Sequence, residues 1–403
     1  MNESDLLIVG AGSAGLTLAL LLANSGLKIS VLEQGPAPTT GPVTLKRVSA
    51  LNLASERLLT RLGVWQQLTA KPAYQAMSVW EADSFAKISF DAQTSQLPSL
   101  GSLVDNEELR QALYQQLQGC PAVRLDFNAR IQSISAGAAQ NLVSTEQGVY
   151  LSRLLVGADG ANSLVRRELK MPQRFWDYDH HAIVALVKTS EPHQATARQV
   201  FLPTGPLALL PMADPHLVSI VWSTSPEQAS TLCEVDANLF NQQLTAACQS
   251  VLGPLDVVSP RSSYPLRMRY STRWVEQNAV LVADAAHTIH PLAGQGMNLG
   301  LMDVAALAEL ILANVSGGKL TVETRWLRQY ERWRKAEAQQ MIVLMEAFKR
   351  GFMAQNPVAK LVRAVGMRAV DRLPLLKEQL LAAAVGERDD LPQQARPAVI
   401  SYS

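Results

Sequence analysis

The chain has 403 residues, of which 48% are hydrophobic and 18% are charged, a composition typical of a globular protein with more than one domain. Its 36 basic and 35 acidic side chains leave a net charge of +1, which argues against a nucleic-acid-binding protein. Three cysteines without a CxxC pair exclude a disulfide framework and a thiolate zinc site, and they fit a reducing cytoplasm.

The start of the chain carries no secretory signal pattern, because the polar residues 1–5 lead directly into a short apolar run. The longest near-continuous apolar run, at 14–23, has about half the length that a membrane-spanning helix needs. We therefore expect a cytoplasmic protein that is soluble or peripheral on the inner face of the cytoplasmic membrane.

The first predicted unit is a βαβ motif. An apolar run at 6–9 is followed by a glycine-rich turn, an apolar helical stretch at 16–23 and a second apolar run at 29–32. The turn reads GxGxxG, and Glu33 ends the second run. Gly10 would make the tight turn, Gly12 would let a pyrophosphate approach the backbone, and Gly15 would allow close helix–strand packing.

The phosphates would lie at the helix N-terminus, and the Glu33 carboxylate would accept hydrogen bonds from the ribose hydroxyls of an adenosine. The same string is compatible with a glycine-rich turn beside a surface glutamate. Even as a dinucleotide site, it does not separate FAD from NAD.

The middle of the chain changes from mixed to mainly β patterning. Helices are predicted at 50–62 and 107–117, a strand at 78–90, and a small antiparallel β element at 130–156. Short strands with proline and glycine between them then predict an antiparallel sheet at 182–187, 198–202, 207–212 and 217–222. Trp222, near a strand end, is assigned to the core, and lining of the substrate cavity is the alternative.

The α/β pattern returns with a buried strand at 279–283 and a helix at 298–314. From Trp326 to about 386 the chain is expected to be mostly helical. The polar residues 387–403, with two prolines, are expected to form a flexible tail.

A second glycine-rich string lies at 157–163, where a short apolar strand runs into a turn with Asp159 and Gly160, followed by Arg166 and Arg167. Taken alone, this string is also compatible with a turn and a helix cap, because asparagine and serine are good caps.

The third and longest string covers 282–300. Asp284 at a strand end faces a loop with three glycines and a proline, and the loop leads into a helix. Such a loop presents backbone N–H groups and a positive helix dipole to an anionic ligand, as the N1/O2 end of a reduced flavin would require.

Together the three strings resemble the FAD-dependent aromatic hydroxylases of the p-hydroxybenzoate hydroxylase type, and most of all the ubiquinone-biosynthesis hydroxylases. The resemblance covers about residues 5–340. It implies an α/β fold with a Rossmann-like FAD-binding domain, an inserted mainly antiparallel β-sheet substrate domain and a helical C-terminal region. The corresponding ranges are 1–75, 100–175 and 272–340 for the FAD-binding domain, 76–99 and 176–271 for the substrate domain, and 341–386 for the helical region.

The resemblance also implies a set of FAD-binding residues. Arg47 would contact the cofactor near its phosphate or ribityl part, and Asp284 would hold the ribityl or phosphate end. The full set is Gly10, Gly12, Gly15, Glu33, Arg47, Asn106, Asp159, Gly160, Asp284, Pro291, Gly294, Gly296, Met297 and Asn298. One position departs from the family, which usually has glycine where this chain has Ala283, so a small local shift is expected there.

His287 and His290 are the candidate catalytic residues, limited to steering a substrate phenol or relaying its proton. A loop-stabilising hydrogen bond is the alternative. Their spacing could also suggest a metal, but no third ligand is visible in the sequence, so no metal site is predicted.

By resemblance, NAD(P)H would reduce the flavin without a domain of its own, since only one GxGxxG is present. A flavin C4a-hydroperoxide would then hydroxylate a polyprenylated phenol in ubiquinone biosynthesis. The alternatives are a related monooxygenase acting on another aromatic or a polyketide, and a non-catalytic flavoprotein assembly subunit. A separate electron donor also stays open.

Residues 341–386 carry seven basic and three acidic side chains interleaved with apolar ones. This pattern is compatible with peripheral membrane contact, with docking of ubiquinone-biosynthesis partners, or with simple packing on the FAD-binding domain. A prenylated phenol is the expected substrate, and no nucleic acid is expected as a partner.

Overall fold

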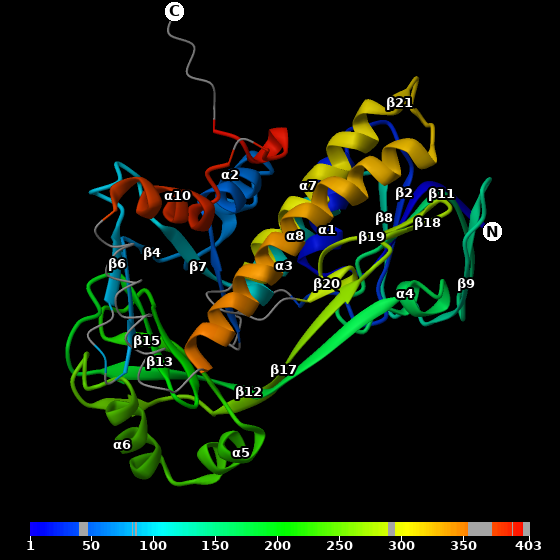
Figure 1. Cartoon of the computed structure of the whole chain (residues 1–403). Coiled ribbons are helices and arrows are strands. Elements are labelled where there is room, and N and C mark those ends of the chain that lie inside the picture. The colour runs from blue at the N-terminus through cyan, green and yellow to red at the C-terminus, as the bar shows by residue number, and fades with distance from the viewer. Residues whose placement is uncertain are drawn as a thin grey trace, which may run out of the picture.

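The computed structural model describes residues 1–39, 47–82, 84, 87–288, 295–353, 373–388 and 390–397. Its described elements form two large sheets with helices around them (Figure 1). The predicted α/β class, with a Rossmann-like sheet and a mainly antiparallel second sheet, is confirmed.

The first sheet is built on parallel strands in the order β19-β11-β1-β2-β8, with β18 antiparallel at one edge and the hairpin partners β10 and β9 beside β11. Its described strands are β1 (Asn2–Val9), β2 (Ile29–Leu32), β8 (Val123–Asp126), β9 (Ile131–Ser135), β10 (Asn141–Thr145), β11 (Gly148–Gly157), β18 (Val275–Glu276) and β19 (Ala279–Leu281).

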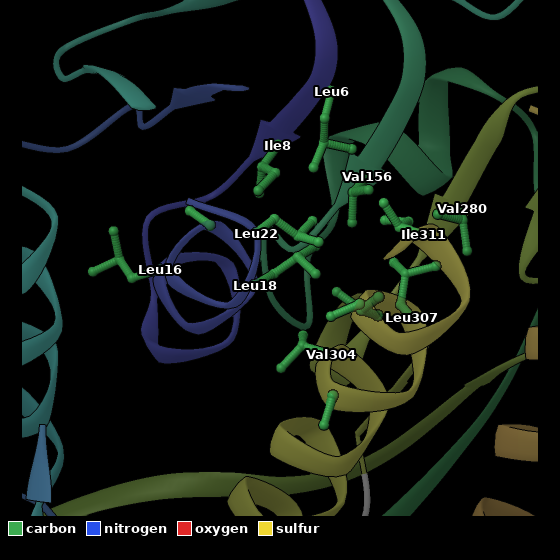
Figure 2. Close-up of a cluster of buried hydrophobic side chains, with 14 of the residues drawn as sticks. Leu6, Ile8, Leu16, Leu18, Leu22, Val156, Val280, Val304, Leu307 and Ile311 are labelled. Carbon is green, nitrogen blue, oxygen red and sulfur yellow. The ribbon is translucent and has the colours of Figure 1, made fainter. Parts of the chain in front are cut away.

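Continuous apolar runs form these strands because a parallel sheet is buried on both faces. Helices α1 (Ser13–Leu22) and α7 (Gln295–Ala313) pack on one face (Figure 2). Leu18 and Leu22 of α1 and Leu307 of α7 point toward Ile8 and Val156 of the sheet, and all five are fully buried. Burying each such side chain stabilises the fold by about 1.5–3 kcal/mol.

Helix α7 is long and apolar enough, at 296–313, to cross a membrane by length and composition. However, 72% of that window is buried inside the fold, as expected for a core helix. Antiparallel to it runs α8 (Thr324–Met353), and the two helices form one side of the molecule (Figure 1).

The second sheet has the order β20-β17-β12-β15-β14-β13-β5-β6, with β16 beside β12, and its pairs are antiparallel except β13 and β5. Its described strands are β5 (Ala76–Glu81), β6 (Lys87–Asp91), β12 (Gln173–Thr189), β13 (Thr196–Leu202), β14 (Gly205–Pro211), β15 (Leu217–Thr224), β16 (Leu255–Val257), β17 (Ser262–Ser271) and β20 (His287–Thr288).

The long strands β12 and β17 belong to the second sheet and reach from it toward the first (Figure 1). One face of the second sheet is covered by α5 (Pro226–Glu234) and α6 (Ala237–Ala247). Trp222 is buried on that face near Phe240, so its assignment to the core is confirmed. The opposite face is free to line a site.

The smaller elements complete the fold. They are the sheet of β3 (Val48–Leu51), β4 (Ala73–Tyr74) and β7 (Gly101–Asp105), the pair β21 (Val315–Ser316) and β22 (Lys319–Leu320), and the helices α2 (Leu53–Arg61), η1 (Trp65–Gln67), α3 (Asn106–Gln118), α4 (Leu164–Glu168), η2 (Ala283–Ala285), α10 (Pro374–Val385) and η4 (Gln393–Ala395).

Three expectations need correction. The predicted helix at 50–62 begins only at Leu53, because residues 48–51 pair with β7 as a strand and Asn52 caps the helix. The predicted strand at 78–90 lies in two strands, β5 and β6, which pair with each other. The domain boundaries themselves stay a prediction, and the one at 175/176 would fall inside the continuous strand β12.

The third correction concerns the predicted flexible tail at 387–403. Glu387 forms an ion pair with Arg57 of α2 at 2.5 Å, and Arg61 donates to the carbonyls of Gln393 and Arg396. Leu391 and Ala395 are buried against the main core. The described part of 387–397 therefore packs on α2. Two arginines of α2 provide hydrogen-bond donors for the polar groups of this segment, and the sequence pattern does not show these contacts.

Candidate functional site

Three loops meet at one edge of the first sheet. They follow β1, β11 and β19, which are parallel neighbours, so their carboxyl ends lie side by side. Ligands of open α/β sheets bind at this edge. A cavity of about 400 Å³ lies there, lined by Gly12 and Ser13 of the first loop, Gly160 of the second and Asp284 of the third. The three strings found in the sequence thus form one site.

The glycines of the first loop differ in how much space the protein leaves for a side chain. A Cβ on Gly15 would lie 1.9 Å from the Gly10 carbonyl oxygen, so helix and turn pack too closely for a side chain. Gly10 has a φ of +109°, and its Cβ would meet Ala158. A Cβ on Gly12 would meet no atom within 4 Å. The protein leaves that space open, and Gly12 caps α1 without a side-chain hydrogen bond.

The side chains of Glu33 and Arg110 hold this turn through hydrogen bonds to its backbone. The Glu33 carboxylate accepts hydrogen bonds from the backbone N–H groups of Ala11 at 2.7 Å and Gly35 at 2.8 Å. The Arg110 guanidinium donates to the carbonyl of Ala11 at 2.9 Å. Each carboxylate oxygen keeps a further lone pair that a ribose hydroxyl could use. The sequence analysis missed Arg110, because a single basic residue inside a helix carries no positional signal.

Arg47 and Asn106 line the cavity opposite the glycines. The Arg47 guanidinium lies 5.3 Å from the centre of the Tyr264 ring. The backbone carbonyl of Arg47 accepts a hydrogen bond from the backbone N–H of Asn106. The buried side-chain oxygen of Asn106 has no hydrogen-bond partner among the described residues. A buried acceptor of this kind is costly unless a ligand or water satisfies it.

Asp159 faces its own loop rather than the cavity. Its carboxylate accepts from the Ser163 hydroxyl at 2.5 Å and from the N–H of Leu164 at 2.6 Å, which caps α4. This geometry favours the capping alternative for Asp159, whereas Gly160 lines the cavity. Arg166 donates to the carbonyls of Ala285 and Ala161, and thereby ties the second loop to the third.

The Asp284 side chain is exposed and lines the cavity. Desolvation raises the pKa of its carboxyl group, and the charges of His287 and Arg47 oppose that rise. Its neighbour Ala283 has a φ of +51°, in the left-handed region that favours glycine. A Cβ on Gly300 of α7 would lie only 2.8 Å from the Ala283 methyl group. The glycine at 300 therefore leaves room for the alanine that this chain has in place of the family's glycine.

Asp303 of α7 anchors the third loop from behind. Its carboxylate accepts from the Ala283 N–H at 3.0 Å, from His287 Nε2 at 2.6 Å and from Arg334 Nε at 2.7 Å. Asp303 and Arg334 are both completely buried. Desolvation would raise the pKa of Asp303, but His287 and Arg334 outweigh it and hold the pKa below its usual range. Arg334 also pairs with Glu337.

His287 does not line the cavity. Its ring is 1% exposed, is bonded to Asp303 and lies 5.1 Å from the Trp274 ring. The Nε2–Asp303 bond favours the loop-stabilising alternative, whereas the buried Nδ1 has no hydrogen-bond partner among the described residues. The role in substrate steering stays a prediction. His290 lies outside the described residues.

The start of α7 contributes Gly296 and Met297 to the cavity. Asn298 does not contribute its side chain, which is buried and bonds the N–H of Asn52 at 3.0 Å and the carbonyl of Ala50 at 2.8 Å. The predicted cofactor contact is thus corrected to a link between α7 and the β3–α2 junction. Pro291 and Gly294 lie outside the described residues.

The second sheet supplies the opposite wall of the cavity, with Gln199, Val221, Ser223, Tyr264 and Arg267. The sequence analysis named none of them. Alternation along the strands shows which residues share a face, but it does not show which face packs on helices and which faces a ligand.

A known protein family matches most of this chain. The profile described as FAD binding domain covers residues 3–344. The chain belongs to this family. It is an FAD-dependent monooxygenase, and FAD is its cofactor. The open space at Gly12 and the unsatisfied oxygen of Asn106 fit that cofactor, because a pyrophosphate needs close backbone approach and a polar group needs a partner.

Relatives of full length support the assignment. The chain is 34% identical over 390 residues to 3-demethoxyubiquinol 3-hydroxylase of Escherichia coli K12, covering 96% of this chain and 99% of the relative. It is 33% identical to ubiquinone hydroxylase UbiL of Rhodospirillum rubrum, covering 95% and 90%. Ubiquinone biosynthesis monooxygenase COQ6 of Danio rerio is 32% identical, with 94% and 89% covered.

Solved structures confirm the fold. A p-nitrophenol 4-monooxygenase from Pseudomonas putida DLL-E4 superimposes with a TM-score of 0.77 at 18% identity, covering 96% of this chain and all of that one. PqsL of Pseudomonas aeruginosa, in complex with 2-aminobenzoylacetate, gives a TM-score of 0.75 at 21% identity, covering 91% and 100%.

Proposed function

We propose that this protein hydroxylates the aromatic ring of a polyprenylated phenol on the route to ubiquinone. NAD(P)H supplies two electrons, one oxygen atom of O₂ enters the ring, and the other leaves as water. Support comes from three relatives, named as a 3-demethoxyubiquinol 3-hydroxylase, a ubiquinone biosynthesis monooxygenase and a ubiquinone hydroxylase. Each is matched over at least 94% of this chain. When bound, FAD supplies the electron transfer and oxygen activation that side chains cannot.

The observation that carries the proposal is the two-sided cavity. One wall is made of the loops at the carboxyl ends of β1, β11 and β19, and the other is the free face of the second sheet. Gly12 and Asn106 would hold the cofactor from the first wall. The second wall presents Val221 and Leu266 together with the polar Gln199 and Ser223. Such a wall can bury a ring, exclude water and still orient a hydroxyl group.

Asp284 and Arg47 would set the charge around the cofactor. Both line the cavity, and Arg47 lowers the pKa of the Asp284 carboxyl group, against the larger effect of desolvation. A carboxylate here accepts hydrogen bonds from ribityl hydroxyls, whereas the guanidinium donates to phosphate oxygens. These contacts, and those of Glu33, Gly160, Gly296 and Met297, are part of the proposal.

A cytoplasmic location with peripheral membrane contact follows from the proposed substrate. A polyprenyl tail partitions into the bilayer, so the enzyme must meet its substrate at the membrane surface or receive it from a partner. Residues 341–386 are the proposed contact, for their excess of basic side chains. Residues 354–372 of this stretch lie outside the described part of the chain.

Turnover by the purified protein tests the proposal. The FAD-loaded enzyme is mixed with NADH or NADPH, O₂ and a phenol carrying three isoprene units, and products are identified by mass spectrometry. We expect a product heavier by one oxygen atom, with ¹⁸O incorporated from ¹⁸O₂. Turnover of other aromatics or polyketides alone would favour the alternative substrate class. Tight FAD binding with no turnover of either, with chemical reductants included, would favour an assembly subunit.

A further inference from the structure

A second cavity of about 110 Å³ lies beside the main one. Its lining is mostly apolar and includes Met77 and Phe90 of the β5–β6 hairpin, Ala197 of β13, and Leu381 and Val385 of α10. We call it the side cavity. Nothing in the reaction chemistry requires it, since the three glycine-rich loops do not contribute to its lining.

The strand register places both cavities on one face of the second sheet. Phe90 lies opposite Met77, and Met77 lies opposite Ala197, which gives one row across β6, β5 and β13. Gln199 lies opposite Ala208, and Ala208 lies opposite Val221, which gives a second row across β13, β14 and β15. Ala197 and Gln199 are two residues apart on β13, so the two rows share a face.

The two cavities also share a wall. Ala50, Gln199, Ala208 and Leu210 line both of them. Gln199 is a buried polar residue. A polar group therefore stands at the junction, with the polar-lined main cavity on one side and the apolar side cavity on the other.

Helix α10 covers the side cavity. Leu381 and Val385 are buried against Leu53, Ala92 and Leu100. The Lys377 ammonium group lies 5.8 Å from the centre of the Phe90 ring. In Figure 1, α10 lies next to β6. Ala384 lines the cavity and is nevertheless exposed, so the cavity opens to solvent beside α10.

We propose that the side cavity holds the apolar tail of the substrate whose aromatic ring lies in the main cavity, and that the tail leaves the protein beside α10. This inference rests on the proposed function and adds the path of the tail. An aliphatic chain is the occupant that fits, because the lining is narrow, apolar and continuous with the wall of the ring site. Arg198 does not conflict with this occupant, since it donates to the carbonyls of His193 and Thr196.

The test compares two ligands of the FAD-loaded protein: a phenol with a tail of three isoprene units, and the same phenol with a methyl group instead. Dissociation constants are measured from the change in flavin absorbance. We expect the tailed phenol to bind the wild type at least about tenfold more tightly, because apolar surface of the tail is buried.

Ala384→Trp places an indole at the opening, and Met77→Trp fills the cavity from the sheet side. In at least one of the two variants, the ratio of the two dissociation constants should fall to about one. Ala383→Trp is the matched control, because Ala383 is also exposed on α10 but does not line either cavity. It should keep the wild-type ratio.

The proposal is overturned if both cavity variants keep the wild-type ratio, or if the control loses it as well, which would mean that α10 acts only by packing. A wild-type ratio near one would also overturn it. In that case hydroxylation of both phenols would leave the proposed function standing. If the wild type binds neither phenol, the tail path and the proposed function fall together.

Discussion

Two aspartates, 19 positions apart in the chain, serve the same loop in opposite ways. Asp284 opens on the cavity, where desolvation raises the pKa of its carboxyl group. Asp303 is sealed behind the loop, where His287 and Arg334 overcome desolvation and lower its pKa. A carboxylate kept for a ligand is left unsatisfied by the protein, whereas one kept for structure is saturated with partners.

This difference predicts that the two carboxylate charges have opposite effects on the stability of the FAD-free protein. The charge of Asp303 stabilises the fold, because it pairs with a buried arginine and accepts the Ala283 N–H. The charge of Asp284 costs stability until a ligand uses it. The following variants test the contrast, from the largest expected effect to the smallest.

Asp303→Asn should lower the free energy of unfolding by about 3 kcal/mol, because it leaves the buried Arg334 with only Glu337 as an acidic partner. Urea unfolding of the FAD-free protein measures the loss. The exposed Asp390, replaced by alanine, is the control and should change stability by less than about 0.5 kcal/mol. Equal effects of the two variants would contradict a structural role for Asp303.

Asp284→Ala should weaken FAD binding by about 10- to 100-fold, which is the loss of hydrogen bonds to a charged acceptor. The FAD-free variant should be at least as stable as the wild type, unlike Asp303→Asn. Fluorescence titration with FAD and urea unfolding give the two readouts. If Asp284→Ala unfolds the protein, or binds FAD as the wild type does, the assignment of the two aspartates is wrong.

The pH dependence separates the same two residues. The folded-state pKa of Asp284 is raised, so its destabilising charge is present at neutral pH and is removed as the pH falls through that pKa. Asp284→Asn should therefore stabilise the FAD-free protein at pH 7, and its advantage should shrink toward acid pH.

Asp303 behaves in the opposite sense, since its folded-state pKa is lowered. Its contribution is complete above the unfolded pKa of about 4 and is lost as the pH falls through the folded value. The stability gap between wild type and Asp303→Asn should stay constant from pH 7 to about pH 5 and close at lower pH. Parallel pH profiles of the two asparagine variants would refute the contrast.

Ala283→Gly should stabilise the protein by about 0.5–1 kcal/mol, because glycine relieves the left-handed backbone at φ +51° but loses some of this gain to chain entropy. Gly300→Ala should destabilise the wild type, since its Cβ would approach the Ala283 methyl group to 2.8 Å. In the double variant most of that cost should disappear. Additive effects in thermal unfolding would show that the two positions do not interact.

The sequence predicts where the glycine-rich loops lie better than it predicts the direction in which their side chains point. The GxGxxG turn, Gly160 and Asp284 reach the cavity because their roles depend on local backbone geometry, which a short string encodes. Asp159, His287 and Asn298 carry the same polar chemistry but face inward. Their direction depends on Ser163, Asp303 and Ala50, and these partners lie 4, 16 and 248 positions away in the chain. No spacing rule records such contacts.

The second sheet shows the same limit. Its strands are predicted from their alternation, but the choice of the ligand face depends on where α5 and α6 pack. The attachment of residues 387–397 depends on two arginines of α2, more than 300 positions earlier in the chain. Local patterns therefore predict the elements, and tertiary contacts decide which of their faces and ends are used.

The lipid quinone profile of cells that lack this protein is the most direct test of its proposed activity. Mass spectrometry should show one under-hydroxylated prenylated phenol, whose missing hydroxyl identifies the ring position. The wild-type chain and Asp390→Ala should restore the profile, and Asp284→Ala should not. An unchanged quinone pool in cells without a redundant hydroxylase would contradict the account, as would full rescue by Asp284→Ala.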